Sequence, residues 1–517
     1  MIARVDGVLG RVTMYRGLTI GLLAIVLVGT VLSAVGAVGV LPAGSLPAGL
    51  LPVAILVSAA VLGAWSVIAS RFFALVFRAQ PHTESAIITG LILSVLLSPT
   101  LDPLYLCVDA LAATLAAASK YVIAPHGRHL LNPAAFGAFA VYSLGLQNTP
   151  WWVGTPWLLP IVALVGAAIV IRTRTAALVG VFLGAALLAR IAASLVGGIG
   201  VLDGLAFAVL YSPILFLGTV MLTEPLTLPP RRRQRFAVAA VVGVLLSVSF
   251  SLVGPQLGPL QPQLVSAPEL ALLIGNVTAF ALARRRGIRL SYLGRRQLTP
   301  TAWEFEFEPS RPLVFRPGQY LELTVPHRRA DGRGSRRTFS IASPPGGTVK
   351  LGMRMPEAER ASSFKTSLAT LEPGRAVSAT AVAGDFTLPS DPAVPVLLVA
   401  GGIGITPFVS QLAAGAPRDT VLVYAVSSTD DLAYASELHR SGARVLVVAP
   451  EPLPRMPEHW RWVGAGPLTP ERLLAEVPDA ARRTTYLSGP PSLIGALRPA
   501  LRRAGVRRIR TDAFLGY

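Results

Sequence analysis

The sequence of 517 residues contains one cysteine, Cys107, and six histidines. One cysteine excludes a disulfide within the chain. It also excludes a zinc or iron–sulfur site held by this chain alone, because such sites need several thiolates. We expect no metal site, and a redox centre in this chain would have to be a flavin or a haem. Cys107 lies in an apolar run, where a buried, unreactive thiol is the expected state.

Acidic residues are also few. There are 27 Asp and Glu against 46 Lys and Arg, which gives a formal net charge of +19. Such an excess would suit a nucleic acid, but in the first 283 residues the basic side chains, Arg190 apart, fall outside the apolar runs, mostly in the short connections between them. Basic connections of this kind determine membrane topology. We therefore expect no nucleic-acid partner.

Repeated apolar runs in the first 286 residues predict an all-α transmembrane domain with the lipid bilayer as its partner. A bilayer-spanning helix needs about 20 apolar residues, and so many apolar helices would leave a soluble protein without polar surface to cover them. The first run is too long for a cleaved signal peptide, so we expect it to be retained. The ten runs lie near residues 18–41, 50–70, 85–98, 103–119, 133–147, 156–171, 176–198, 204–222, 236–253 and 268–283.

Basic residues occupy every second connection between these runs, and the intervening connections contain no Lys or Arg. The positive-inside rule then predicts a multi-pass protein of the cell (inner) membrane with both termini in the cytoplasm. The outer connections contain Trp151, Trp152 and Trp157, which suit an interfacial belt. The basic connections contain Arg71, Arg78, Lys120, Arg128, Arg172, Arg174, Arg231, Arg232, Arg233, Arg235, Arg284, Arg285 and Arg286.

Four charged residues, Glu84, Asp109, Arg190 and Glu224, lie near or within predicted spans. A charge in hydrocarbon costs about 2.5 kcal/mol or more unless it is paired or reaches the interface. Glu84 and Glu224 stand at cytoplasmic span ends, where a carboxylate either caps a helix or serves a function. Arg190 either extends to the outer surface or pairs with an anion such as Asp109 or a flavin phosphate.

Three stretches on the predicted cytoplasmic side contain sequence motifs in addition to apolar residues. They are Thr83–Gly90, Gly127–Phe136 and Met221–Pro225. Together they resemble the B-type membrane component of sodium-translocating NADH:quinone reductase and the D-type membrane component of the Rnf electron-transport complex, over about residues 60 to 283. The resemblance implies two inverted five-span halves, with flavin and, in some members, quinone between the helices. Those membrane components attach FMN to Thr in a Ser-Gly-Ala-Thr stretch, which is absent here, so only noncovalent FMN is expected.

After residue 286 the pattern becomes that of a soluble protein. Short alternating strands such as Glu304–Phe307 and Tyr320–Val325 predict an antiparallel FAD-binding barrel over residues 287–392. Apolar strands that alternate with helical stretches then predict a parallel α/β domain over residues 393–517. The expected fold is a transmembrane domain over residues 1–286, followed by these two domains on the cytoplasmic side.

Residues 290–517 resemble the ferredoxin–NADP reductase superfamily, on the motifs Arg316–Tyr320 and Arg337-Thr338-Phe339-Ser340. The resemblance implies FAD, and the residue types fit this cofactor. Arg337 offers a fork of donors to a flavin phosphate. Phe339 would project from the same strand face and stack on the isoalloxazine, and Ser340 on the other face would hydrogen-bond flavin N5.

Further motifs in this half suit phosphate and nucleotide binding. Small residues and backbone N–H groups at a helix start, at Ser362 and Ser363, favour a second flavin phosphate contact. A glycine turn follows an apolar strand and would cradle a pyrophosphate, with Thr406 capping the next helix. Small residues in a later segment would leave room for nicotinamide. These two nucleotide-side sets are Gly401, Gly402, Gly404, Thr406 and Pro407, and Ser488, Gly489 and Pro490.

The end of the chain, Asp512–Tyr517, resembles the terminal acid-x-Phe of these reductases, in which Phe514 or Tyr517 would cover the flavin. The segment Ser427–Asp431 lacks an Arg for the 2'-phosphate and contains two acids, which favours NADH over NADPH.

The sequence therefore predicts an FAD-dependent NAD(P)H oxidoreductase that passes electrons to a quinone, a flavin or another carrier held in the membrane. One alternative is a reductase for a soluble acceptor, with the first half as an anchor or transporter. Another is a haem ferric reductase, which needs paired histidines inside spans. His82, His126 and His129 are the histidines of this half, and all lie in polar connections.

Overall fold

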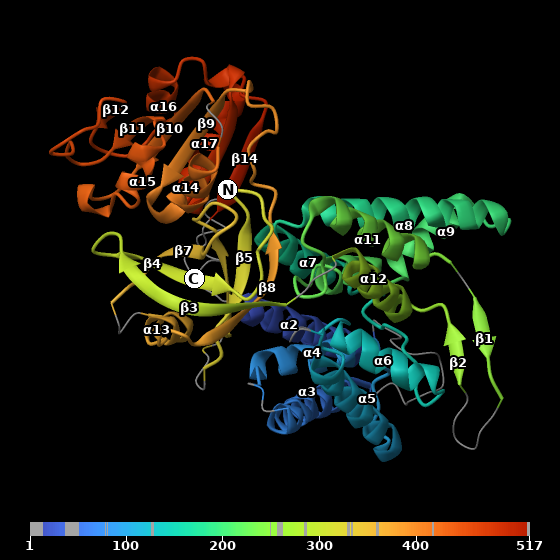
Figure 1. Ribbon diagram of the computed structural model, residues 1–517. Coiled ribbons are helices and arrows are strands. Elements are labelled where there is room, and N and C mark those ends of the chain that lie inside the picture. Colours follow the sequence, from blue (N-terminus) through green and yellow to red (C-terminus); the bar gives the residue numbers. More distant parts are fainter. Residues whose placement is uncertain are drawn as a thin grey trace. The chain divides into compact units, whose positions relative to one another are not determined.

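The computed structural model describes residues 14–36, 51–77, 79, 81–125, 129–248, 250–255, 262–283, 287–327, 331, 334–357, 361–415 and 418–513. The chain forms two compact units, a helical unit within Arg11–Arg285 and a reductase unit within Arg286–Tyr517 (Figure 1). Among the residues used to predict topology and haem ligation, Arg78, His126, Arg128 and Arg284–Arg286 lie outside the described residues.

The helical unit contains α-helices, one π-helix and a small antiparallel pair of strands. The elements are α2 Met14–Ala34, α3 Leu51–Val76, α4 Thr83–Leu96, α5 Pro103–Val122, α6 Pro133–Ser143, α7 Leu159–Thr173, α8 Ala176–Val196, α9 Val201–Leu210, α10 Ile214–Phe216, the π-helix η3 Leu217–Met221, α11 Arg232–Leu245, β1 Ser251–Val253, β2 Gln263–Val265 and α12 Pro268–Ala283.

Each predicted apolar run overlaps a helix, but the helices differ in length. Four of those described, α2, α3, α5 and α8, are long and apolar enough to cross a bilayer, and α9 with α10 and η3 forms a fifth candidate bent by 60°. Helices α4, α7 and α12 are apolar but shorter. The ten-span count therefore stays a prediction.

Three expectations for this unit are wrong. The ninth run was predicted to span residues 236–253, but its helix ends at Leu245 and residues 251–253 form a strand. The reason is that polar and apolar residues alternate with period two over 247–252, which favours a strand. Trp151 and Trp152 are only 2% exposed, so they are not part of an interfacial belt, whereas Trp157 is exposed. Cys107, expected to be buried, is also exposed.

Helix α4 is the buried centre of this unit. It spans 14 residues, about 21 Å, and almost every residue from Ala86 onward is buried. The chain after α6 completes its carboxyl end, because Trp151 N donates to Leu96 O at 3.1 Å and Trp152 Nε1 donates to Ser94 O at 2.7 Å. These bonds satisfy carbonyls that a helix end otherwise leaves unpaired.

The reductase unit begins with an antiparallel sheet of order β6-β5-β8-β3-β4-β7. An isolated bridge between Ile341 and Leu351 links the edge strands, so the sheet curls into a barrel around Phe305 and Phe307. Its elements are β3 Ile288–Gln297, β4 Ala302–Pro309, β5 Tyr320–Thr324, β6 Arg336–Ser340, β7 Val349–Arg354, α13 Ser363–Ala369 and β8 Ala376–Ala383.

A parallel sheet of order β12-β11-β10-β9-β13-β14 follows. Alternate residues of β9 enter different cores, Val396 and Leu398 one and Leu397 and Val399 the other, as expected of a sheet covered on both faces. The elements are β9 Val396–Gly401, η5 Gly402–Ile405, α14 Thr406–Ala413, β10 Thr420–Ala425, η6 Thr429–Asp431, α15 Ala435–Arg440, β11 Arg444–Val448, β12 Trp460–Gly464, α16 Pro470–Glu476, η7 Ala480–Arg482, β13 Thr484–Gly489, α17 Pro491–Arg503 and β14 Ile509–Ala513.

The strand order reverses between β9 and β13, which are neighbours in the parallel sheet. In open α/β sheets the crevice at such a reversal, outside the carboxyl ends of the strands, is where ligands bind. The fold therefore places the glycine turn after β9 and the end of β13 at one ligand-binding edge.

The close packing of α3 against α4 gives a test of the helical unit. A Cβ at Gly90 would overlap Leu62 O and lie 2.7 Å from Gly63 Cα, whereas a Cβ at Gly184 would meet nothing within 4 Å. We expect Gly90→Ala to lower the thermal unfolding temperature of the detergent-purified protein, because two backbones must separate. Gly184→Ala should leave it unchanged or raise it, since Ala favours helix by about 1 kcal/mol over Gly. Equal effects of the two substitutions would contradict this packing.

Candidate functional site

The predicted flavin motif forms β6, and its side chains take the two faces that strand geometry demands. The Arg337 Cζ atom lies 5.2 Å from the centre of the Phe364 ring, and the Phe339 ring centre lies 5.8 Å from the same ring. Arg337 and Phe339 therefore share one face, toward α13, while Ser340 is buried and Thr338 is exposed.

Arg337 and the start of α13 converge on one carboxylate, that of Asp331. Arg337 Nη2 lies 3.5 Å from Asp331 Oδ1, and Ser363 N donates to Asp331 Oδ2 at 3.1 Å. Ser363 Oγ in turn accepts from Asp331 N at 2.8 Å and lies 3.0 Å from His327 Nε2. Ser362 caps α13 by accepting from Lys365 N.

This arrangement is relevant to flavin binding. The two groups predicted to donate to flavin phosphates, the Arg337 guanidinium and the N–H groups at the start of α13, both contact the Asp331 carboxylate. A carboxylate and a phosphate both accept charge-assisted hydrogen bonds from a guanidinium and from backbone N–H groups. The Asp331 carboxylate accepts from both donors here, so these residues have the donor chemistry that the phosphate part of FAD needs.

Ser340 connects the flavin motif to the parallel sheet. Its hydroxyl donates to Asp512 Oδ2 on β14 at 3.4 Å, and Asp512 is paired with Ser488 across the β13–β14 ladder. The ends of β6, β13 and β14 are therefore adjacent. Of the predicted terminal residues, Asp512 reaches the flavin motif, and Phe514 and Tyr517 lie outside the described residues.

The glycine turn after β9 is packed directly against the end of β13. Gly402 adopts φ 53°, a left-handed conformation that favours glycine. A Cβ at Gly404 would lie 2.6 Å from Ser488 O and 2.7 Å from Gly489 Cα. Gly401 also faces Pro490, the residue before α17. Gly404 therefore packs on backbone, and Gly401 packs on the side chains of Leu493 and Pro490.

Thr406 and Ser488, two residues of the nucleotide-side motifs, are both buried, but only the Thr406 hydroxyl has a hydrogen-bond partner among the described residues. Thr406 was expected to cap α14, but it is fully buried and its hydroxyl donates back to Ile403 O at 3.1 Å, next to the buried Pro407. Ser488 is also fully buried, and its hydroxyl has no hydrogen-bond partner among the described residues. A buried hydroxyl without a partner is costly, so Ser488 is a group that a bound nucleotide could satisfy.

The two acids after β10 have different roles. Asp431 accepts from Thr301 Oγ1 at 2.7 Å and pairs with Arg354 Nη2 at 3.2 Å, so it joins the parallel sheet to the barrel. Asp430 is exposed. The predicted repulsion of a 2'-phosphate by two acids therefore rests on Asp430 alone.

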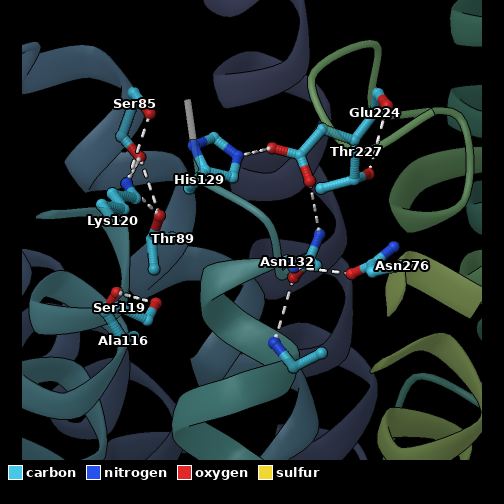
Figure 2. Close-up of polar contacts among 11 residues, drawn as sticks. Ser85, Thr89, Ala116, Ser119, Lys120, His129, Asn132, Glu224, Thr227 and Asn276 are labelled. Atoms are coloured by element: carbon cyan, nitrogen blue, oxygen red, sulfur yellow. Dashed lines mark hydrogen bonds and ion pairs between the residues drawn. The ribbon is translucent and has the colours of Figure 1, made fainter. Parts of the chain in front are cut away.

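The helical unit contains a second constellation, here called the polar centre, formed by Ser85, Thr89, Lys120, His129, Asn132, Glu224 and Asn276 (Figure 2). Lys120 Nζ donates to Thr89 Oγ1 at 2.8 Å, to Ser85 O at 3.2 Å and to Ser85 Oγ at 3.3 Å. Lys120 thus ties the end of α5 to the start of α4.

Glu224 organises the other half of the polar centre. Its Oε1 lies 2.9 Å from His129 Nε2, and its Oε2 accepts from Asn132 Nδ2 at 2.9 Å (Figure 2). Asn132 caps α6 through Ala135 N, and its own N–H donates to Asn276 Oδ1 on α12 at 2.7 Å. The three sequence stretches that begin α4, lead into α6 and follow η3 are therefore brought together.

Sequence reasoning missed several of these residues. In the sequence, Lys120 was interpreted only as one of the basic residues that determine membrane topology. Its position at the end of a predicted span was the one feature that could have indicated a site. Asn276 lies in an apolar run and gave no signal beyond being a polar residue there. Asp331 lies in a basic loop whose fold the sequence did not reveal. Arg190, for which an anionic partner was considered, lies over the Phe207 ring at 5.5 Å.

No family model matches the sequence. The aromatic O-demethylase reductase subunit of Amycolatopsis sp. is 30% identical over 223 residues, which are 40% of this chain and 62% of that protein. Ferredoxin–NADP reductase B of Sorangium cellulosum is 31% identical over 149 residues, 28% of this chain and 59% of that protein. The toluate 1,2-dioxygenase electron transfer component of Pseudomonas putida is 30% identical over 204 residues, 38% of this chain and 56% of that protein. The chain thus spans about 60% of the length of these relatives.

Among solved structures, a cytochrome P450 reductase of Amycolatopsis matches with 26% identity and a TM-score of 0.38, covering 44% of this chain and 70% of that one. The sequence relatives are named as reductases or electron-transfer components, and they confirm the resemblance of the C-terminal region to the ferredoxin–NADP reductase superfamily. The resemblance of the helical unit to membrane components of the sodium-translocating reductase and the Rnf complex stays a prediction.

The position of Asp331 gives a test of the flavin phosphate site. We expect Asp331→Asn to tighten FAD binding by roughly tenfold, because removing a carboxylate that competes for Arg337 gains about 1 kcal/mol or more of phosphate interaction. Arg337→Gln should weaken binding by a similar factor or more. FAD affinity is measured by fluorescence titration of deflavinated protein, with the exposed Glu372→Gln as a charge-matched control. Weaker FAD binding in Asp331→Asn would show that the carboxylate supports the site instead.

Proposed function

We propose that this chain is a membrane-bound FAD-dependent NAD(P)H oxidoreductase, which passes electrons from the nicotinamide through FAD to an acceptor held by the helical unit. One observation carries the proposal: Ser340 of the flavin motif contacts Asp512, which is paired with Ser488 beside Gly404 of the glycine turn. A flavin on β6 and a nucleotide at the switch point would therefore meet at one place.

When bound, FAD would supply the hydride-accepting chemistry, and the protein supplies binding and orientation. Arg337 and the Ser363 backbone N–H would hold the phosphates, and Phe339 would flank the ring. The Ser340 hydroxyl donates its one proton to Asp512 Oδ2 here, and it would have to turn that proton away from Asp512 to donate to flavin N5. The glycine backbone at 401–404 lets the nicotinamide nucleotide approach, and Ser488 offers it an unsatisfied hydroxyl.

NADH is the proposed nucleotide rather than NADPH. The segment after β10 offers no arginine to a 2'-phosphate, and the exposed Asp430 would repel one. The preference is expected to be modest, because the charge of Asp431 is already paired with Arg354.

For the helical unit we propose ten spans in two inverted halves, with both termini and the reductase unit in the cytoplasm of a cell whose inner membrane holds the protein. The polar centre supports an acceptor there, because charged groups inside a membrane bundle mark binding sites and pathways. A quinone or a noncovalently bound FMN would find donors in Lys120 and His129 and an acceptor in Glu224. Half-length and broken helices such as α4 and α9–η3 are also typical of midplane binding sites.

An alternative proposal is a reductase for a soluble protein, with the helical unit as an anchor or transporter. The names of the demethylase and dioxygenase relatives, which are reductase components, favour it. A haem ferric reductase has less support, because His129 is bonded to Glu224 and His82 Nδ1 accepts from Ser85 N at the start of α4.

The central test is anaerobic reduction of the purified, FAD-loaded protein. We expect NADH to bleach the flavin absorbance and Ser340→Ala to slow bleaching by about tenfold or more, because one preorganised donor is lost. Ser335→Ala, at the residue before β6, serves as the control, and its flavin should be bleached as fast as that of the unsubstituted protein. If neither NADH nor NADPH bleaches the flavin, the proposed function is wrong.

A second test separates the membrane-held acceptor from a soluble one. We expect Lys120→Met and Glu224→Gln to lower NADH:quinone activity in lipid by about tenfold or more, since the first removes the ammonium donor of the polar centre and the second removes its carboxylate acceptor. NADH:ferricyanide activity, which needs only the reductase unit, should persist. Thr114→Val, which removes the Trp65–Thr114 hydrogen bond elsewhere in the helical unit, is the control. Unchanged quinone activity in both variants would favour the anchor alternative.

A further inference from the structure

The last part of the parallel sheet is strongly basic. Residues 480–511 contain eight arginines and no acidic residue. The eight are Arg482, Arg483, Arg498, Arg502, Arg503, Arg507, Arg508 and Arg510.

Two of these arginines are used by the fold. Arg483 is 7% exposed and pairs with Asp419 and with Asp479, each at 2.8 Å. Its hydrogen bond lowers the pKa of Asp479, which keeps this acid ionised and paired. Arg510 donates to Asp385 O at 2.8 Å and to Thr387 O at 2.7 Å. The other six are exposed and form no ion pair within the part of the chain that the structure describes.

Five of the six lie at one edge of the sheet, here called the basic edge. It begins with η7, which leads into β13, continues with the last turn of α17, and ends in the turn that enters β14. Because β13 and β14 are parallel, all three sites lie at the amino ends of the strands. The basic edge comprises Arg482, Arg502, Arg503, Arg507 and Arg508.

The basic edge is remote from the nucleotide. The glycine turn and Ser488 lie at the carboxyl ends of β9 and β13, and β13 has six residues, about 20 Å of strand. These arginines therefore cannot serve the nucleotide phosphates. Asp419 and Asp479, acids near the same edge, are already bound by Arg483, so the edge keeps its positive charge.

The fold explains only part of this charge. Arg502 and Arg503 are favourable at the carboxyl end of a helix, where the backbone dipole is negative. Arg482 ends the short 3-10 helix η7, and Arg507 and Arg508 lie between α17 and β14, so none of the three stands at the end of an α-helix. The only aromatic residue in 480–511 is the fully buried Tyr486, so the stacking platform that single-stranded nucleic acids need is missing from this segment.

We propose that the basic edge binds the anionic phospholipid headgroups of a bilayer. The inference rests on the membrane placement in the proposed function. Guanidinium groups match phosphate geometry, and the negative surface of an anionic leaflet attracts clusters of basic residues. The covalent chain ties the reductase unit to the helical unit, because only residues 284–287 separate α12 from β3, at most about 14 Å of extended chain.

The experiment uses the full chain in lipid nanodiscs of phosphatidylcholine alone or of phosphatidylcholine with an equal part of phosphatidylglycerol. In a Cys107→Ser background, a fluorophore is placed by Ala504→Cys at the basic edge or by Ser492→Cys at the other end of α17. The two positions are about 18 Å apart along the helix. Quenching by headgroup-labelled lipid reports contact with the bilayer surface.

We expect quenching at 504 in the anionic discs only, lost in high salt because the attraction is screened, and no lipid dependence at 492. Arg507→Gln with Arg508→Gln should weaken docking about 30-fold, since each basic residue near an anionic surface contributes about fivefold. Arg289→Gln with Arg375→Gln, two exposed barrel arginines, should not.

Two results would overturn the proposal: equal quenching at 504 in neutral and anionic discs, or equal quenching at 504 and 492. An acidic protein would then remain as the candidate partner of the basic edge. Flavin bleaching by NADH is recorded on the same discs. Loss of bleaching with quenching intact would count against the proposed reductase activity alone. A chain that does not enter the discs would contradict the membrane placement and the lipid proposal together.

Discussion

The reductase unit depends on a contact between two backbones. Gly404, in the turn after β9, lies so close to Ser488 and Gly489 at the end of β13 that a single added carbon would not fit. This contact lies at the reversal of strand order, where a helix start and the strand ends meet. It also holds Ser488 beside Asp512, and through Asp512 the sheet reaches Ser340 of the barrel. The geometry of the proposed electron transfer follows from that one close approach.

The helical unit obeys a different constraint, the cost of burying charge away from water. Lys120 is hydrogen-bonded by Ser85 and Thr89 of α4, and Glu224 by His129 and Asn132 before α6, as a low-dielectric environment requires. The donors and acceptors come from the starts of α4 and α6, the end of α5 and the middle of α12. A polar centre of this kind fixes the register of four helices at once, and it offers both donors and an acceptor to a bound molecule.

The scarcity of acids connects these observations. With 27 acids against 46 basic residues, several acids that the structure describes occupy positions where basic or N–H donors converge. Asp331 faces Arg337 and the start of α13, Glu224 faces His129, and Asp431 faces Arg354. Arginines in excess of these pairs remain on the surface, and the amino edge of the parallel sheet is where they gather.

The sequence by itself determined the elements and their chemistry. Apolar runs located the helices, period-two patterns located the barrel strands, and the glycine turn was correctly placed after an apolar strand, because these signals are local. Only the tertiary structure decided which distant residues meet. No local pattern predicts the contacts between distant segments, which are those of Asp331 with Arg337, of Asp512 with Ser340, and of Lys120 with Thr89.

Burial was also decided by the tertiary structure. Trp151, Trp152 and Thr406 have the residue types of surface or cap positions, but packing from other elements buries them. Hydrophobic periodicity is a property of neighbouring residues, whereas a site forms only when the whole chain has packed.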